Sequence, residues 1–209
     1  MYARERSAEK LSKIIDLSPR VPQGFKGPPS TNVGVQFEVK TKRDRGAYWQ
    51  SGQVYMSLHT GCHVESALHC FENGEAIDQI SLERVIGSAV ILDLTPVDER
   101  AIIDVEDLER GRKRLGERGE TMKAARWLVE KRPKCIGCDF FEEPAARQPG
   151  WTADQFVVHR AILGAGIPLI EGLVHLKDLP PRCQFFAPFY HFAGIDSAPA
   201  RTFAVIEDE

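Results

Sequence analysis

The sequence lacks the features that would assign it to a specialised class of protein. No apolar run approaches the roughly 20 residues of a membrane span. The first ten residues contain no apolar stretch like that of a secretory signal peptide. A net charge of −3 argues against a general nucleic-acid or anionic-membrane surface. We therefore expect a cytoplasmic protein that binds neither nucleic acid nor membrane.

The sequence also lacks the cysteine pattern of a disulfide framework or a zinc ribbon. Its five cysteines, an odd number, fit a reducing compartment. Cys135 and Cys138 form a Cys-x-x-Cys pair, but the second pair that a zinc ribbon needs is missing. A redox pair needs an exposed thiol at a helix N-terminus, whereas this pair ends an apolar segment. We interpret these cysteines as structural.

Length and composition are those of an ordinary globular domain. The chain has 209 residues, of which 43% are hydrophobic and 27% are charged. We found no internal repeat, low-complexity tract or clear linker. The sequence therefore predicts a single domain over residues 1–209, long enough to bury a sizeable core.

The most informative stretch is the histidine-rich segment at residues 57–71. It contains His59, His63, Glu65 and His69, which are three of the six histidines in the protein and one carboxylate. Imidazole and carboxylate are the usual ligands of zinc and neighbouring first-row metals. The alternative is a histidine-rich surface loop or a set of hydrogen-bonded core histidines. We favour a metal site because several desolvated imidazoles would all need partners.

The spacing of these four residues favours a bent, extended backbone. In a helix, Glu65 would lie roughly 120° or more around the axis from both His59 and His63, so the four side chains could not converge. In an extended chain, all four odd-numbered positions share one face. A straight strand would still place His59 and Glu65 roughly 20 Å apart, too far for one ion. Gly61 is the residue that permits the necessary bend.

The surrounding sequence alternates between strand and helix patterns. Residues 33–40 and 48–58 predict an antiparallel pair of strands that leads into the histidines. The apolar run at residues 87–94 predicts a strand that is buried on both faces. Residues 105–114 and 121–131 predict amphipathic helices, and 134–141 predicts another buried strand.

A second candidate site element follows at residues 152–171. The capping-box pattern at residues 152–155 predicts a helix start, and the helix should end near Gly164. His159 would point inward from this helix. A short strand at residues 167–170 is followed at once by Glu171. The two side chains can meet if the helix packs back on the sheet.

Several of these segments together resemble the metal-dependent cyclase or kynurenine formamidase family, which includes isatin hydrolases and a zinc-dependent dienelactone hydrolase. The family signature His-x-Gly-Thr-His-x-Asp-x-Pro-x-His stands here as His-Thr-Gly-Cys-His-Val-Glu-Ser-Ala-Leu-His, residues 59–69. Ile-Asp-Leu-Ser at residues 15–18 resembles the first strand of the family. His159 with residues 166–171 resembles its second metal element. Ala187-Pro188 and Ala-Pro-Ala-Arg at residues 198–201 resemble its C-terminal pattern.

The resemblance implies a fold, an assembly and a set of residue roles. The fold would be α/β, with a compact mixed or antiparallel β core and helices packed outside, assembled as a homodimer or homotetramer. Two divalent ions per chain, Zn²⁺ or Mn²⁺, are implied. His59, His63 and Glu65 would bind one, and Glu65 would bridge to a second held by His159 and Glu171. His69 would be the general acid/base.

The chain departs from the family pattern at several points. Glu65 replaces the usual Asp, Cys62 replaces Thr and Ala67 replaces Pro. The Arg-Thr-Gly-Trp motif of relatives is not found between residues 105 and 135. Phe25 is the only aromatic residue in the early Pro/Gly-rich loop, where relatives place an aromatic residue that contacts the substrate.

The ligand chemistry predicts a hydrolase of a small amide, formamide, lactam, ester or lactone. A metal lowers the pKa of bound water from 15.7 to about 7, and the resulting hydroxide can attack a carbonyl carbon. Imidazole, with an unperturbed pKa near 6.5, suits the proton transfer that we assign to His69. Two alternatives stay open: a metal- or ligand-binding protein that has lost hydrolytic activity, and a purely structural metal site.

Overall fold

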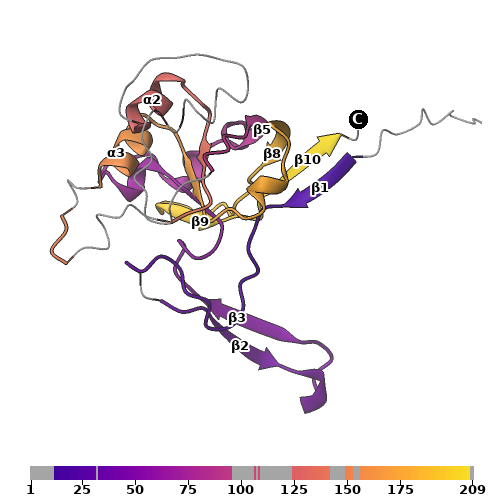
Figure 1. Cartoon of the computed structure of the whole chain (residues 1–209). Coiled ribbons are helices and arrows are strands. Elements are labelled where there is room, and N and C mark those ends of the chain that lie inside the picture. The colour runs from indigo at the N-terminus through magenta and orange to yellow at the C-terminus, as the bar shows by residue number, and fades with distance from the viewer. Residues whose placement is uncertain are drawn as a thin grey trace, which may run out of the picture.

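The computed structural model describes residues 12–31, 33–95, 106, 108, 124–141, 149–152 and 156–207. These residues form two four-stranded sheets, one two-stranded ribbon and two α-helices of seven residues or more. Figure 1 shows the sheets and helices gathered in one body, from which the ribbon extends. Mixed α/β architecture with largely antiparallel pairing confirms the predicted fold class.

The first sheet has the strand order β1-β10-β8-β5 and is antiparallel throughout. Its strands are β1 (Ser12–Asp16), β5 (Ile86–Val90), β8 (Arg182–Phe186) and β10 (Phe203–Glu207). The C-terminal strand β10 is thus central and pairs with β1 at the start of the described chain.

The second sheet has the order β6-β7-β4-β9 and carries the histidine-rich segment. Its strands are β4 (His63–Glu65), β6 (Ile136–Gly137), β7 (Leu169–Glu171) and β9 (Ser197–Pro199). Strand β4 is antiparallel to both β7 and β9, while β6 and β7 are parallel. The histidine-rich segment is therefore flanked by chain from the last third of the sequence.

The main hydrophobic core combines side chains from both sheets. Val64 of β4, Ile170 of β7 and Ala198 of β9 belong to the same buried cluster as Phe185 of β8 and Ala204 of β10. Because side chains alternate along a strand, the neighbours of Val64 and Ile170 point to the opposite face of the second sheet. That opposite face holds the site residues.

Two helices lie beside each other on one side of the body (Figure 1). Helix α2 spans Ala124–Glu130 and helix α3 spans Val157–Gly164. Ile162 and Leu163 of α3 pack with Leu169 of β7 in a second buried cluster. This packing places the helix over the face of β7 and β4 that is turned away from the main core. No helix in the described ranges is long and apolar enough to cross a bilayer.

The two-stranded ribbon consists of β2 (Gln36–Thr41) and β3 (Ser51–Tyr55). It extends away from the body in Figure 1. Directly paired residues of an antiparallel ribbon share a face, so Phe37 and Val54, which are paired, lie on one side with Val39. All three side chains are substantially exposed. The ribbon therefore presents an uncovered apolar face.

Several predicted elements are confirmed, with shifted ends. The antiparallel pair at 33–40 and 48–58 corresponds to β2 and β3. The helix predicted at 121–131 corresponds to α2 within the described part of the chain, and that at 105–114 lies outside it, apart from Glu106 and Leu108, which are helical.

Three predictions about these elements are wrong in detail. The run at residues 87–94 is not buried on both faces, because β5 is an edge strand of the first sheet and Val90 is half exposed. The strand predicted at 134–141 is limited to Ile136–Gly137. Helix α3 starts at Val157, later than the capping pattern implied, and Phe156 stacks on His159 at this start, with ring centroids 3.9 Å apart. For β5, the edge position in the sheet overrides the local apolar pattern.

Candidate metal centre

Strand β4 directs two site residues to one face. Val64 points into the main core, so His63 and Glu65 on either side of it point the other way. Both are fully buried, since β7 and β9 flank the strand and α3 lies over it. Fully buried carboxylates are rare unless they are paired or bind a metal.

Strand β7 and helix α3 bring the second predicted element to the same face. Glu171 is the direct cross-strand partner of His63, and their Oε2 and Nε2 atoms are 3.8 Å apart. His159 points inward from α3, with Nε2 3.1 Å from Glu171 Oε1. The same Nε2 lies 3.5 Å from Glu65 Oε2. Helix α3 thus packs back on the sheet, which is the condition under which the sequence allowed His159 and Glu171 to meet.

The backbone bends at Gly61, as the spacing predicted. Gly61 adopts φ = +69°, a conformation that favours glycine. The carbonyl oxygen of Gly61 lies 3.0 Å from His63 Nδ1, which orients that ring. Beyond the bend, His59 returns to the site, with Nδ1 2.8 Å from Glu65 Oε1 and 3.3 Å from His63 Nε2.

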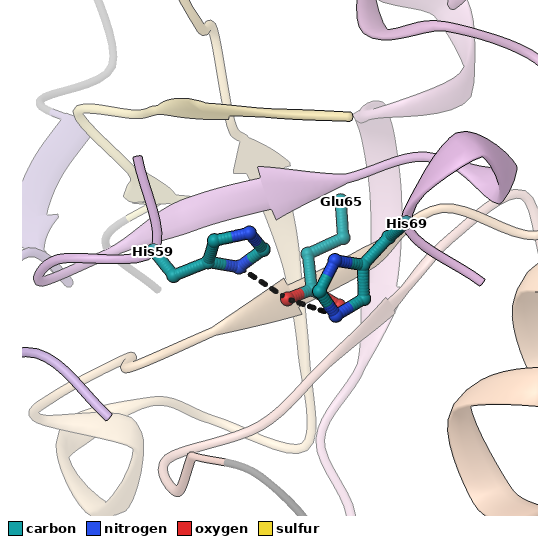
Figure 2. A group of neighbouring side chains, drawn as sticks. All are labelled: His59, Glu65 and His69. Carbon is teal, nitrogen blue, oxygen red and sulfur yellow. Dashed lines mark hydrogen bonds and ion pairs between the residues drawn. The ribbon is translucent and has the colours of Figure 1, made fainter. Parts of the chain in front are cut away.

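His69 reaches the site from the opposite end of β4. It ends the short 3₁₀ turn Ala67–His69, and its Nε2 lies 3.9 Å from Glu65 Oε1. Figure 2 shows the rings of His59 and His69 on two sides of the Glu65 carboxylate. His69 is less buried than His63 and Glu65, and its ring borders the cavity described below.

The donor atoms converge on the two oxygens of Glu65. Its Oε1 faces His59, His63 and His69, whereas its Oε2 faces His159. Oε2 is buried and makes no hydrogen bond to the described residues. Ligand atoms around a tetrahedral ion with bonds of about 2.1 Å lie about 3.4 Å apart, close to many separations seen here. The donor set and its spacing fit divalent metal ions with Glu65 between them.

Two groups of three donors have atoms within 4.8 Å of one another: His59, Glu65 and His69, and His63, Glu65 and Glu171. This grouping differs from the predicted one, because His69 joins the first group and His63 joins the second. All six predicted site residues lie in one cluster. Which of them bind metal stays a prediction.

The electrostatics of the cluster favour charged carboxylates. Burial opposes ionisation of Glu65, but hydrogen bonds from His59 and His63 outweigh it and hold the pKa of this carboxyl well below its usual range. Burial likewise disfavours the imidazolium of His59, yet the hydrogen bonds to Asp196 and Glu65 raise the pKa of His59 to about 10. The buried anions thus attract positive charge, which a metal ion also supplies.

A cavity of about 150 Å³ opens beside the cluster. Its walls combine the polar side chains with apolar and aromatic ones: Pro28, Ser30, Thr31, His59, Glu65, His69, Trp151, Phe156, His159 and Glu171. Phe156 stacks on His159 and packs edge-on toward His69, and Trp151 lies 5.9 Å from Phe156 between ring centroids. An aromatic wall therefore stands next to the candidate ligands.

Sequence reasoning missed Asp196, which contacts two histidines of the site. Its Oδ2 lies 2.9 Å from both His59 Nε2 and His69 Nδ1. Ser197, the next residue, places Oγ 3.1 Å from His59 Nε2. The sequence signal was slight: an acidic residue stands two positions before the Ala198-Pro199 segment that carried the family resemblance.

The two histidines outside this cluster are surface residues: His175 and His191 are exposed, and His191 contacts the backbone oxygen of Asp78. None of the five cysteines forms a disulfide. Burial raises the pKa of Cys135 to about 11 and that of Cys138 well above its usual range, which suits structural thiols rather than a redox pair.

Known proteins resemble this chain over most of its length. A kynurenine formamidase of Salinibacter ruber is 28% identical over 210 residues, covering 93% of this chain and 97% of the relative. A solved structure described as a potential metal-dependent hydrolase with cyclase activity is 26% identical and has a TM-score of 0.70. The match covers 95% of this chain and 100% of the chain in that structure.

Isatin hydrolase A from Labrenzia aggregata, solved with benzyl benzoate bound, shares the fold. Its TM-score is 0.78 at 20% identity, with 94% of each chain covered. The family model described as "Putative cyclase" matches residues 15–121, about half of the chain, including the histidine-rich segment. The protein therefore belongs to the cyclase family.

Proposed function

We propose that this protein is a metal-dependent hydrolase of a small amide, formamide, lactam, ester or lactone. The observation that carries the proposal is the buried Glu65, whose two oxygens face separate sets of imidazoles beside an aromatic-walled cavity. The names of the relatives, kynurenine formamidase and metal-dependent hydrolase, support hydrolysis of an amide bond.

The proposed ligands form two centres. His59, His63 and Glu65 would hold one ion, and Glu65, His159 and Glu171 would hold the other. Imidazole and carboxylate ligands accept both Zn²⁺ and Mn²⁺, so we propose either metal. A divalent cation, when bound, lowers the pKa of a coordinated water to about 7 and polarises a carbonyl group.

His69 is the proposed general acid/base. It is the most exposed of the site histidines, and it borders the cavity where a substrate would bind. Its Nδ1 contacts Asp196, which leaves Nε2 directed toward the cluster. From there it can transfer a proton to the leaving group of a bound substrate.

The cavity suits a substrate with one aromatic ring. A closed apolar cavity of about 150 Å³ accommodates benzene in another protein, and the cavity here has this volume. Phe156 and Trp151 offer ring faces for stacking. We therefore propose an N-formyl aromatic amine or a related cyclic amide as the substrate class.

Metal analysis tests the proposal directly. Tag-free protein is reconstituted with Zn²⁺ or Mn²⁺, desalted and analysed by elemental mass spectrometry, with formanilide hydrolysis measured on the same samples. We expect about two ions per wild-type chain, fewer in both His63→Ala and Glu171→Ala, and no loss in the exposed control His175→Ala. Wild-type protein that binds no metal after reconstitution would overturn the hydrolase proposal.

A metal-binding protein without hydrolytic activity is the second candidate. Glu65 stands where relatives have Asp, and its extra methylene displaces the carboxylate by about one bond length. A screen of formamides, lactams, esters and lactones with fully loaded protein separates the two candidates. Sustained turnover that disappears on chelation and returns with metal excludes the binding-only function.

We also propose a homodimer or homotetramer that uses the β2–β3 ribbon. An isolated two-stranded ribbon is marginally stable in water, and this one leaves Phe37, Val39 and Val54 exposed on one face. Contact with a second copy would cover these side chains. The cytoplasm is the proposed compartment, because five cysteines that form no disulfide fit a reducing environment.

A further inference from the structure

Asp196 is anchored at the end of the second sheet by its backbone. It directly precedes β9, and its carbonyl oxygen accepts hydrogen bonds from the backbone N–H and the hydroxyl of Ser66, each 2.9 Å long. Ser66 in turn directly follows Glu65 of β4. The backbone of Asp196 is therefore held independently of its side chain, which is free to serve the site.

One carboxylate oxygen of Asp196 serves two imidazoles. Oδ2 lies 2.9 Å from His59 Nε2 and 2.9 Å from His69 Nδ1. The two rings are neighbours, with centroids 4.5 Å apart and planes inclined by 44°. Because both contacts use the same atom, a change at Asp196 reaches both histidines at once.

These contacts hold a proton on the nitrogen of each ring that faces Asp196. An ionised carboxylate only accepts hydrogen bonds, so His59 Nε2 and His69 Nδ1 both carry a proton. The other ring nitrogens face Glu65 Oε1, with His59 Nδ1 at 2.8 Å and His69 Nε2 at 3.9 Å. Both of these nitrogens are therefore directed toward the proposed metal and substrate positions.

We propose that Asp196 is a shared positioning residue that orients both His59 and His69 by holding the proton on His59 Nε2 and on His69 Nδ1. This inference rests on the proposed function, in which His59 is a metal ligand and His69 transfers a proton. A carboxylate behind a ligating imidazole orients the ring and raises its basicity. The same carboxylate would direct His69 Nε2 toward the substrate as a proton acceptor. Metal binding by His59 and proton transfer by His69 would then both depend on Asp196.

The first test measures tautomers and does not depend on activity. Histidine ring ¹⁵N–¹H correlation spectra of metal-free protein would be recorded for wild type, Asp196→Asn, Asp196→Ala and the matched control Ser197→Ala. Ser197 contacts only His59 among the two rings. In wild type we expect a proton fixed at His59 Nε2 and another at His69 Nδ1. In both Asp196 variants, at least one of the rings should become a mixture, whereas Ser197→Ala should leave His69 unchanged.

The second test measures metal affinity and turnover in loaded protein. We expect Asp196→Ala to weaken Zn²⁺ binding about 10–100-fold in chelator competition. It should also lower kcat more than it changes KM, with partial recovery in Asp196→Glu. Wild-type tautomers retained in a folded Asp196→Ala protein overturn the inference whatever the activity is. If Asp196→Ala does not fold, the Asp196→Asn spectrum decides. Loss of the tautomers in a protein without hydrolytic activity supports the positioning role and contradicts only the proposed function.

Discussion

His63 and Glu171 lie directly opposite each other across the antiparallel β4–β7 pair, with Nε2 and Oε2 3.8 Å apart. This register also pairs Val64 with Ile170 in the main core. A slip of β7 by one residue against β4 would turn Glu171 into the core and Ile170 out of it. Burial of Val64 and Ile170 therefore stabilises the arrangement that brings the imidazole and the carboxylate together.

Glu65 should be required for both ions, because its two oxygens face different sets of histidines. We expect Glu65→Ala to lose both metals, whereas Glu171→Ala retains the ion near His59. Elemental mass spectrometry of desalted protein measures the stoichiometry, and circular dichroism checks that each variant is folded. One ion retained in Glu65→Ala would show that Glu65 does not bridge.

His69→Ala should separate proton transfer from metal binding. A general acid/base typically contributes 10²–10⁴-fold to the rate, so we expect kcat to fall by about that factor while metal content is unchanged. The structure also groups His69 with His59 and Glu65 as a possible ligand set. Loss of an ion from His69→Ala would therefore identify it as a ligand and withdraw the proposed role.

Gly172 permits β7 to approach the bend at Gly61. It has φ = +71°, and a Cβ added there would lie 2.7 Å from the Gly61 carbonyl oxygen and 2.5 Å from Phe141 Cε1. Gly166 is a matched control, with φ = +72° and no neighbouring atom within 4 Å of the added Cβ. Gly166→Ala should cost about 1–2 kcal/mol of unfolding free energy from backbone conformation alone.

Gly172→Ala should cost about 1–3 kcal/mol more than this control, because of overpacking. It should also weaken metal binding, since the displaced Gly61 carbonyl orients His63. Urea denaturation and metal titration of the two variants measure both effects. Equal stability of the two alanine variants would show that the close approach is not required.

Partly buried Cys135 should make stability depend on alkaline pH. Burial raises the pKa of Cys135 to about 11, above the value of about 8.5 for an unfolded cysteine. With a raised folded-state pKa, the thiol contributes its full stabilisation below about pH 8.5. This stabilisation is lost as the pH rises from about 8.5 toward 11, because the unfolded chain ionises first. We expect the unfolding free energy of wild type to fall by up to about 1.4 kcal/mol per pH unit more than that of Cys135→Ala in this window. Parallel curves from urea titrations would contradict the burial effect.

The apolar face of the ribbon should control assembly. We expect Phe37→Ser and Val54→Ser to shift the protein toward monomer, because both side chains lie on the exposed apolar face. Gln53→Ser is the matched control, since Gln53 pairs with Glu38 on the opposite face. Light scattering coupled to size-exclusion chromatography measures the mass. A wild-type monomer, or an oligomer unaffected by both serine variants, would contradict the proposed interface.

Local sequence was sufficient to predict much of the site. The odd-numbered spacing of His59, His63 and Glu65, with Gly61 between them, predicts a bent extended chain because side-chain alternation and glycine's access to positive φ are local properties. The apolar pattern of α3 likewise predicted that His159 points inward. These features depend on residues close together in the chain.

Tertiary structure alone decided the features that local patterns cannot encode. Whether an apolar strand is central or at an edge depends on its neighbours in the sheet. The apolar sequence of β5 therefore predicted burial on both faces, but the strand lies at an edge with Val90 half exposed. Asp196 reaches His59 across 137 positions of sequence because β9 pairs with β4. The sequence by itself determined the ligand chemistry and the local bend. Only long-range strand pairing decided that the carboxylates of Asp196 and Glu171 lie next to those histidines. That pairing is stabilised by a hydrophobic core to which distant segments contribute.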